Sequence, residues 1–475
     1  MLRKIRKLIL HPNRYFYDYF RKKLGFRKYF VTDKIRLLDA GNHQKWHNVL
    51  FSHPYLYLYY KLNKRLRKPA YPILVNYRIE TLEKNATGGG KRVVLTVELE
   101  RNNTIYFADP EIVLKALSNE EPYLAGKIFK FNFQGSDNSV FIDGEVRFGT
   151  GIKISFIGNN NKLHISKNCR LISGLVNLPG SSNTIYLGSV FIFKGGTINI
   201  QGNANSISFG DNCAINANSH IISKGDGNTL EAKNDIICLS GSKVIFNKSD
   251  NYAYIGAETK ISAACRIHFI GSNALLYTCG QSTLNISSLF SSNTIFFYGY
   301  GSSIGMSFTC SEYEAKNIII GSDCMFSHHI HFRNATGHAI YDGTNKERIA
   351  RGKSIIIGDH VWIGYGVRIV KGVNINSGSM IGADSFLVKD IPAKCMAAGS
   401  PAKVIRENIL WTRKGPHDAT AEEILNEFES YLEPENPPES IGWERLLEID
   451  SMEPFMASKE KVAQIHKILK HLDPI

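Results

Sequence analysis

Histidine and cysteine side chains are the groups in this sequence whose spacing first suggests chemistry, namely metal binding. His328, His329 and His331 lie close together, and imidazole nitrogens are common zinc ligands. On a strand, however, His329 and His331 would share one face, so the three side chains cannot easily surround one ion. The eight cysteines include no CxxC pair, which predicts reduced, buried thiols. We therefore expect no metal site.

An asparagine repeat in the middle of the chain predicts the elements that carry these groups. Alternating apolar residues follow each asparagine, as in NSVFI at position 138, and the repeat recurs every 20 to 23 residues. The repeats start at Asn138, Asn161, Asn183, Asn205, Asn228, Asn251, Asn273 and Asn293. Most of these asparagines follow a glycine, and both residue types tolerate positive φ, which predicts a turn. Each repeat therefore reads as one coil of a β-solenoid, with a half-buried strand after the turn.

From position 355 the repeat shortens to six residues. Inward positions are predicted for Ile357, Ile363, Ile369, Ile375, Ile381 and Leu387. Small residues four places further on suit crowded corners, so each hexad would form one face of a triangular coil. Three hexads, or 18 residues, would close one coil. In the longer repeats, inward positions also suit Cys169, Cys213, Cys265 and Cys324.

Positive charge is concentrated at the start of the chain. The net charge is +14, and residues 1–30 hold ten Lys or Arg against one acid, Asp18. Nucleic-acid binders carry basic surface over their fold, so we expect no nucleic-acid partner. Basic and aromatic residues together suit contact with an anionic membrane surface. A solvated basic arm or a partner-docking helix is the alternative interpretation.

Four regions follow from these patterns. Residues 1–75 form a basic, mainly helical region for membrane-surface contact or docking, and 76–130 form a small mixed region. Residues 131–406 form the β-solenoid. Residues 407–475 form a helical tail that packs on the solenoid or on neighbouring subunits, with a capping box, TAEE, at 420–423. The fold class is mainly β. Neither a spanning helix nor a secretory signal is recognisable, so we expect a cytoplasmic protein.

The hexad segment resembles the C-terminal signature of the hexapeptide-repeat acyltransferases. It reads IIIGDHVWIGYGVRIVKGVNINSGSMIGADSFLVKDIPAKCMAAGSPAKVIRE at 355–407, and the specific resemblance covers roughly 320–407. Sugar O-acetyltransferases are nearest in pattern, including the galactoside, maltose and capsule-modifying enzymes. The resemblance implies a left-handed parallel β-helix, a homotrimer, and acetyl-CoA bound in the groove between neighbouring subunits.

The resemblance also assigns the catalytic base. In the family it lies in a Gly-His pair before the hexads, which here is His338 in NATGHAIYDG. A neutral imidazole there would take the proton of the acceptor hydroxyl and return it to the CoA thiolate. A backbone N–H of a coil turn would hold the oxyanion. Many relatives have Asp two residues before the His, where this chain has Thr336, so the orienting group stays open. Asp342 is a candidate because it lies in the same loop.

Trp362 and Tyr365 are expected near the donor. Trp362 lies between inward Val361 and Ile363, so its side chain must point outward. It resembles the family's tryptophan that packs against the pantetheine arm, and an anchor at a trimer interface is the alternative. Tyr365 stands where sugar acetyltransferases often have Ser, which is a departure from the family pattern.

The remaining donor contacts are implied by the last hexads. Ala383 matches the residue whose backbone amide meets the cofactor. Lys389, Lys403 and Arg406 match positions near the CoA phosphates and adenine, where cations are required. Ordinary surface charge is the alternative for each. Val388 stands where relatives often have Thr.

The functional prediction is acetyl transfer from acetyl-CoA to a hydroxyl of a capsular or other cell-surface polysaccharide. His329 and His331 would then contact the acceptor sugar. The basic start resembles the leaders of bacterial capsule-assembly enzymes, which implies peripheral contact with the cytoplasmic face of the inner membrane or with capsule-assembly proteins. The alternatives are an N-acetyltransferase of a nucleotide-linked amino sugar, a non-catalytic glycan-binding scaffold, and a zinc hydratase.

Overall fold

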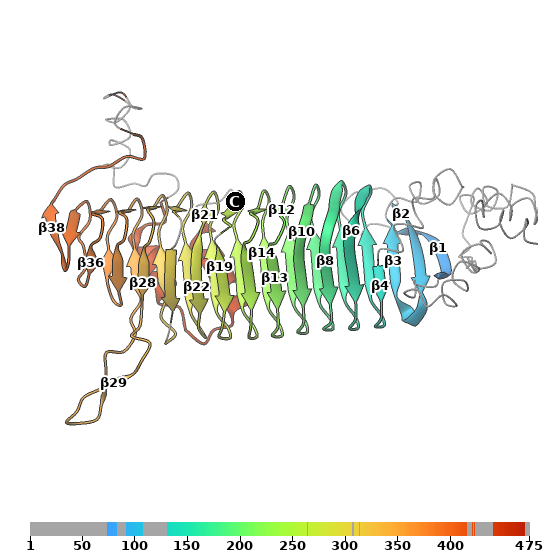
Figure 1. Cartoon of the computed structure of the whole chain (residues 1–475), viewed down its shortest axis with the longest axis horizontal. Coiled ribbons are helices and arrows are strands. Elements are labelled where there is room, and N and C mark those ends of the chain that lie inside the picture. The colour runs from blue at the N-terminus through green and yellow to red at the C-terminus, as the bar shows by residue number, and fades with distance from the viewer. Residues whose placement is uncertain are drawn as a thin grey trace, which may run out of the picture.

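A parallel β-solenoid dominates the computed structural model (Figure 1). The structure describes residues 74–82, 92–107, 131–263, 265–305, 308–312, 314–415, 420, 422 and 440–470. The predicted basic region, 1–75, lies outside the described residues except for its last two positions. The prediction of a mainly β solenoid fold is confirmed.

One side of the solenoid is a 14-stranded sheet, here called sheet A. Its strands, in spatial order, are β1 (Leu74–Leu82), β2 (Arg92–Leu99), β3 (Thr104–Phe107), β5 (Ser139–Ile142), β7 (Lys162–Ile165), β9 (Thr184–Leu187), β11 (Ser206–Phe209), β14 (Thr229–Ala232), β17 (Tyr252–Ile255), β20 (Leu275–Thr278), β23 (Ile295–Tyr298), β26 (Ile318–Ile320), β31 (Ile355–Ile357) and β34 (Asn374–Ile375). The strands from β3 onward are parallel, whereas β1, β2 and β3 pair antiparallel, with the short helix η1 (Glu100–Asn102) before β3.

The other two sides of each coil carry one long strand or a pair of short ones. The long strands are β6 (Val146–Phe156), β8 (Cys169–Leu178) and β10 (Ile192–Ile200), after the short β4 (Phe131–Phe133). The pairs are β12 (Ala214–Ile215) and β13 (His220–Ser223), β15 (Ile237–Cys238) and β16 (Lys243–Phe246), β18 (Lys260–Ile261) and β19 (Arg266–Phe269), β21 (Thr283–Leu284) and β22 (Ile286–Phe290), β24 (Ser303–Ile304) and β25 (Phe308–Glu312), β27 (Met325–Phe326) and β28 (His331–Arg333), β32 (Trp362–Ile363) and β33 (Arg368–Val370), and β35 (Met380–Ile381) and β36 (Phe386–Leu387). The antiparallel pair β37 (Met396–Gly399) and β38 (Ala402–Arg406) ends the solenoid.

A buried ladder of asparagines explains most of the sequence repeat. Its members are Asn103, Asn138, Asn161, Asn183, Asn205, Asn228 and Asn251, all almost fully buried. The side-chain oxygen of Asn161, for example, accepts the backbone N–H of Asn183 at 3.0 Å and its side-chain amide at 3.0 Å. Because the next coil supplies each donor, the ladder satisfies polar groups that would otherwise be orphaned in the core.

Two of the eight predicted repeat asparagines do not join the ladder. Ala274, rather than Asn273, donates its N–H to the side-chain oxygen of Asn251. Asn273 and Asn293 lie one residue earlier in their coils and adopt φ of 58° and 62°. Positive φ therefore falls on the residue before the ladder position, and the expectation that the ladder asparagines themselves make this turn is wrong. The turns lie where the repeat predicted them.

Stacked glycines at these turns are required by close approach. A Cβ added to Gly158 would lie 2.1 Å from the carbonyl oxygen of Gly180, one coil on. The backbone of the next coil therefore leaves no space for a side chain, and φ is not the cause at this position.

The hexads close one coil every 18 residues, as predicted. Trp362 pairs with Met380, and Arg368 pairs with Phe386. All six predicted inward aliphatics are at most 1% exposed. The four cysteines predicted to point inward are buried and free. Burial raises the pKa of the Cys169 and Cys213 thiols to about 11, which keeps them protonated and unreactive.

The tail returns to sheet A as two helices, α9 (Trp443–Asp450) and α10 (Ser458–Ile468). Apolar residues of both helices pack on outward residues of β17 to β26 such as Tyr254, Tyr277 and Phe297. In the described part of the tail, these two helices pack on the solenoid. The predicted capping box at 420–423 lies largely outside the described residues. No helix in the described ranges is long and apolar enough to cross a membrane.

Candidate functional site

The predicted base lies on an arm that projects from the solenoid. The arm, residues 334–352, joins β28 to β31 and contains the antiparallel strands β29 (Ile340–Tyr341) and β30 (Arg348–Ile349) (Figure 1). His338 precedes β29, and its side chain is exposed. Its carbonyl accepts a hydrogen bond from the Thr336 hydroxyl at 2.6 Å, which fixes the local turn. The imidazole is therefore open to a second molecule.

The returning strand of the arm is fastened to the neighbouring coil. The Glu314 carboxylate accepts the N–H of Gly352 at 2.8 Å and pairs with the guanidinium of Arg348. The Lys371 ammonium donates to the carbonyl of Ala350 at 2.5 Å. The N–H of Gly352, more than the charge of Arg348, lowers the pKa of Glu314. These contacts fix the direction in which the arm leaves the solenoid.

Asp342 lies in the turn at the tip of the arm. Its carboxylate accepts the N–H groups of Thr344 at 2.7 Å and Asn345 at 3.2 Å, and these bonds lower its pKa. Across the part of the chain that the structure describes, Asp342 makes no hydrogen bond to His338. Its observed role is to shape the turn, and its role in orienting His338 stays a prediction.

Three residues predicted from the sequence lie together beside the arm. The ring of His329 stands edge-on to Tyr365, with centroids 5.1 Å apart and an interplanar angle of 72°. His331 pairs with Arg368 across β28 and β33. The side chains of these three residues and of Arg368 are exposed on the coils that flank the arm. Within the described ranges, no group of three metal-ligating side chains occurs.

Trp362 points outward, as predicted, between fully buried Val361 and Ile363. Its outer side is partly covered by Trp411, whose ring lies 5.9 Å away at 48°. Trp411 belongs to the segment that follows β38 and is itself buried. The tail of the same chain is therefore one partner of Trp362, and contact with the donor stays a prediction.

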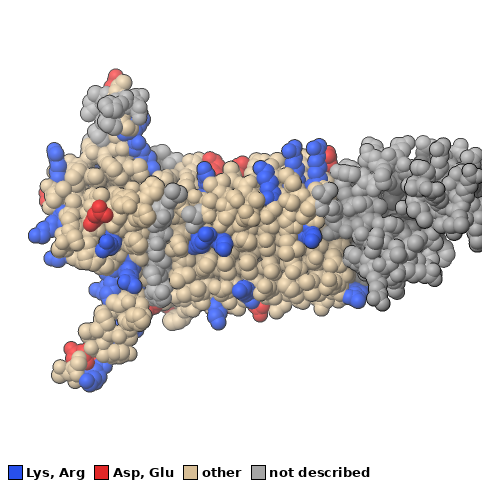
Figure 2. Space-filling model, viewed as in Figure 1, with Lys and Arg blue, Asp and Glu red and all other residues tan. Residues whose placement is uncertain are grey.

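The predicted donor residues lie in the last coils of the solenoid. Ala383, Lys389, Lys403 and Arg406 are all exposed. Figure 2 shows basic side chains around this end of the molecule. Within the described part of the chain, none of these three cations pairs with an acid. Their charges are therefore available to phosphate groups.

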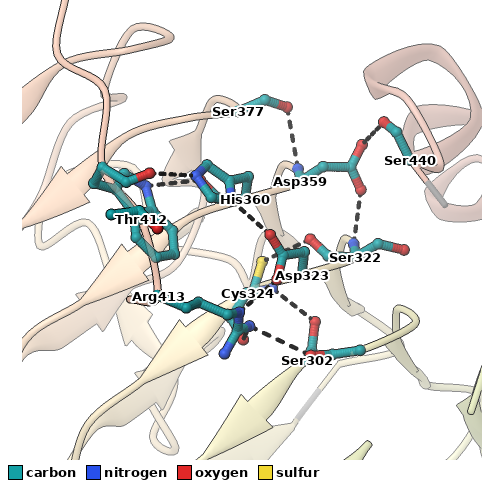
Figure 3. A network of polar contacts seen from close by, with 12 residues as sticks. Ser302, Ser322, Asp323, Cys324, Asp359, His360, Ser377, Thr412, Arg413 and Ser440 are labelled. Atoms are coloured by element: carbon teal, nitrogen blue, oxygen red, sulfur yellow. Dashed lines mark hydrogen bonds and ion pairs between the residues drawn. The ribbon is translucent and has the colours of Figure 1, made fainter. Parts of the chain in front are cut away.

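The sequence did not reveal a polar network that fastens the tail (Figure 3). His360 places Nδ1 2.6 Å from the Asp323 carboxylate and Nε2 3.0 Å from the Trp411 carbonyl. The His360 and Trp411 rings stack at 3.9 Å and 9°. Both imidazole nitrogens are therefore engaged by oxygen atoms of the same chain. His360 is therefore a structural residue and is not free to act as a base.

Two further residues complete this network. Arg413 bonds the Asp323 carboxylate at 2.5 Å and the Cys324 carbonyl at 2.8 Å. Burial would raise the pKa of Asp323, but the bond from His360 and the charge of Arg413 outweigh it and lower that pKa. Next to His360, the Asp359 carboxylate accepts the Ser440 hydroxyl at 2.7 Å. One coil corner thus holds both the departing and the returning segment of the tail.

Comparison with known proteins places the chain near polysaccharide acetyltransferases. No family model matches it. It is 41% identical over 97 residues to a polysialic acid O-acetyltransferase of Escherichia coli O1:K1 (20% of this chain, 32% of that protein). It is 38% identical over 117 residues to that of Neisseria meningitidis (24% and 54%). It is 34% identical over 117 residues to the galactoside O-acetyltransferase of Escherichia coli K12 (23% and 57%).

The chain thus spans between a third and somewhat over half the length of these curated relatives. A solved polysialic-acid-specific acetyltransferase aligns with 54% of this chain and 98% of its own, at 27% identity and a TM-score of 0.34, which is a loose superposition. The predicted resemblance to hexapeptide-repeat sugar O-acetyltransferases is confirmed by the sequence matches.

Proposed function

We propose that this protein transfers acetyl from acetyl-CoA to a hydroxyl of a cell-surface polysaccharide. The observation that carries the proposal is the sequence similarity to two polysialic acid O-acetyltransferases and a galactoside O-acetyltransferase. The hexad coils and the exposed His338 on its arm support it, because they supply the scaffold and an accessible base.

His338 is the proposed general base. Its imidazole takes the proton of the acceptor hydroxyl as that oxygen bonds to the thioester carbonyl carbon. The carbon–sulfur bond then breaks, and the CoA thiolate receives the proton from the imidazolium. The acceptor sugar would lie against His329 and His331, which are exposed on the coils beside the arm. Tyr365, whose ring contacts His329, would lie on the donor side of the acceptor.

The acetyl donor would lie along the last coils. Lys389, Lys403 and Arg406 offer exposed cations for its phosphates, and Ala383 offers a backbone N–H. Trp362 would contact the pantetheine arm beside Trp411. We further propose a homotrimer, in which neighbouring subunits enclose the donor, and contact of residues 1–75 with the cytoplasmic face of an anionic membrane.

Thiol release from acetyl-CoA by the full chain tests this proposal, with surface polysaccharide of the source cells as acceptor. We expect acceptor-dependent release that falls about 10²- to 10⁴-fold in His338→Ala, the usual contribution of a general base. His220→Ala is the matched control, because His220 lies on the outer face of β13, far from the arm. Equal rates in both variants would exclude His338 as the base. Absence of both release and CoA binding would leave a glycan-binding scaffold.

A further inference from the structure

One side of the solenoid carries basic side chains in a line that ends at the arm. This side consists of the later halves of β6, β8 and β10, followed by β13, β16, β19, β22, β25, β28 and β33. The basic residues in register along it, here called the basic column, are Lys153, His220, Lys243, Arg266, His331 and Arg368. The helices α9 and α10 pack on sheet A, which is a different side of each coil. Because β28 leads directly into the arm, the column ends at the base of the arm.

No acid interrupts the basic column. The other positions in register hold Leu, Thr or Ser, and the outward positions two residues further along the same strands hold no Asp or Glu. One of these further positions is Arg333, which is exposed on β28 together with His331. Within the described ranges, no ion pair includes a residue of the column. Most charged side chains along the solenoid in Figure 2 are likewise Lys or Arg.

The electrostatic effect of the column is visible at a neighbouring histidine. Lys243 and Arg266 stand in register on adjacent strands, about 4.8 Å apart, and His268 follows Arg266 on β19. Burial lowers the pKa of His268, and the charges of Lys243 and Arg266 lower it further. The positive potential that acts on His268 also attracts an anion that approaches this side from solvent.

We propose that the basic column binds an anionic polysaccharide along its length, with one end of the bound stretch at the arm that carries His338. Carboxylate, phosphate or sulfate groups of such a polymer complement the cations. Single-stranded nucleic acid uses aromatic rings on which its bases stack, and no outward position of this side between β6 and β33 holds Phe, Tyr or Trp. A DNA duplex carries one charge per about 1.7 Å, which is far denser than this column.

This inference rests on the proposed function, because the bound polymer would be a distant stretch of the acceptor. Four strand spacings separate Lys243 from His331, which corresponds to about 19 Å. A longer acceptor is held both at Lys243 and at the base of the arm, which raises its effective concentration at His338. A shorter acceptor is held at only one of these places at a time.

Binding of size-fractionated polysialic acid and of source-cell surface polysaccharide to the full chain tests the column without requiring acetyl transfer. Each exposed ion pair changes affinity by about 2- to 5-fold. We therefore expect Lys243→Gln/Arg266→Gln to weaken binding of fractions longer than about 20 Å by about 5- to 20-fold. Fractions shorter than this should lose no more than about 2-fold, because they engage one end at a time. The difference should shrink as salt is raised, since salt screens exposed charges.

Two variants and a neutral ligand serve as controls. Arg170→Gln/Lys260→Gln also removes one Arg and one Lys, from exposed positions on the adjacent side, which carries β12 and β15. Arg266→Lys keeps the charge but changes the group that donates to the Gly241 carbonyl at 3.1 Å, so it should bind as the wild type does. Carboxyl-reduced polysialic acid, which is neutral, should bind the wild type and the variants equally weakly.

Weaker binding of long anionic fractions that is confined to Lys243→Gln/Arg266→Gln supports the column as a binding surface, even if no acetyl is transferred, in which case only the proposed function fails. Equal binding by the two double variants overturns the inference, as does failure of both polysaccharides to bind. Polysialic acid that binds no better than its neutral form has the same consequence. Tighter binding of single-stranded DNA than of either polysaccharide would overturn the assignment to a glycan.

Discussion

Lys461 gives the most quantitative prediction, because its amine is buried where α10 meets the solenoid. The side chain is fully buried, and Nζ donates to the Pro454 carbonyl at 2.8 Å. Burial lowers the pKa of Lys461 from 10.5 to about 8, although Glu453 opposes the shift. The unfolded tail therefore binds more protons than the docked tail between pH 8 and 10.5. Docking should strengthen as pH rises through this window.

The expected gain follows from the size of the shift. Each pKa unit corresponds to about 1.4 kcal/mol, so docking of α10 should gain about 2 to 3 kcal/mol between pH 7.5 and 10.5. Lys461→Met removes the cost of the buried ammonium but also loses the bond to Pro454. We expect docking about 1 kcal/mol stronger at pH 7.5 in Lys461→Met, and this variant should lose the pH dependence.

Hydrogen exchange of α10 amides, corrected for intrinsic rates at each pH, measures the free energy of opening. Lys459→Met is the matched control, because Lys459 is exposed on the same helix. A wild-type opening free energy that stays flat with pH would refute the reasoning, as would a pH dependence that survives in Lys461→Met.

Three further predictions concern the solenoid, the arm and the tail. Asn183→Ala leaves two buried donors of Asn205 unpaired, so the free energy of unfolding measured by urea denaturation should fall by about 2 to 4 kcal/mol. A fall of less than about 0.5 kcal/mol would count against a stabilising role of the ladder. Glu314→Gln should lower kcat several-fold with the KM for acetyl-CoA unchanged, and in the wild type the Glu314 contribution to arm docking should disappear as pH falls through its lowered pKa; identical kcat values would exclude a positioning role. Trp411→Ala should release the tail to limited proteolysis near residue 440, whereas unchanged cleavage would show that Asp359 suffices.

The regular parts of the solenoid could be predicted from the sequence because inward positions repeat along it. Ile363 and Ile381 fall on the same inward column simply because one coil takes 18 residues. The repeat could not show that Asn161 bonds Asn183, since the partner lies one coil away and is invisible in local sequence. For the same reason the sequence does not show that Ala274, one residue after Asn273, takes the ladder position in that coil.

The candidate site was predicted unevenly. Outward exposure of Trp362 followed from its buried neighbours, but its contact with Trp411 did not, because that contact joins segments 49 residues apart with no shared periodicity. Ile409 and Trp411 are both buried in the structure. In the sequence, the only sign of this docked segment is that the two apolar residues alternate in NILW. His338 came from resemblance alone, and its arm is too short a hairpin to be recognised by its pattern.

Transfer of isotopically labelled acetyl from acetyl-CoA to source-cell polysaccharide is the most direct test of the central claim. The account predicts label on the polymer that mild alkali removes, as for an O-acetyl ester, and that is lost in His338→Ala. Label that survives alkali would identify an amide and therefore an N-acetyltransferase. A polymer that gains no label while the protein still binds it would contradict the proposed reaction.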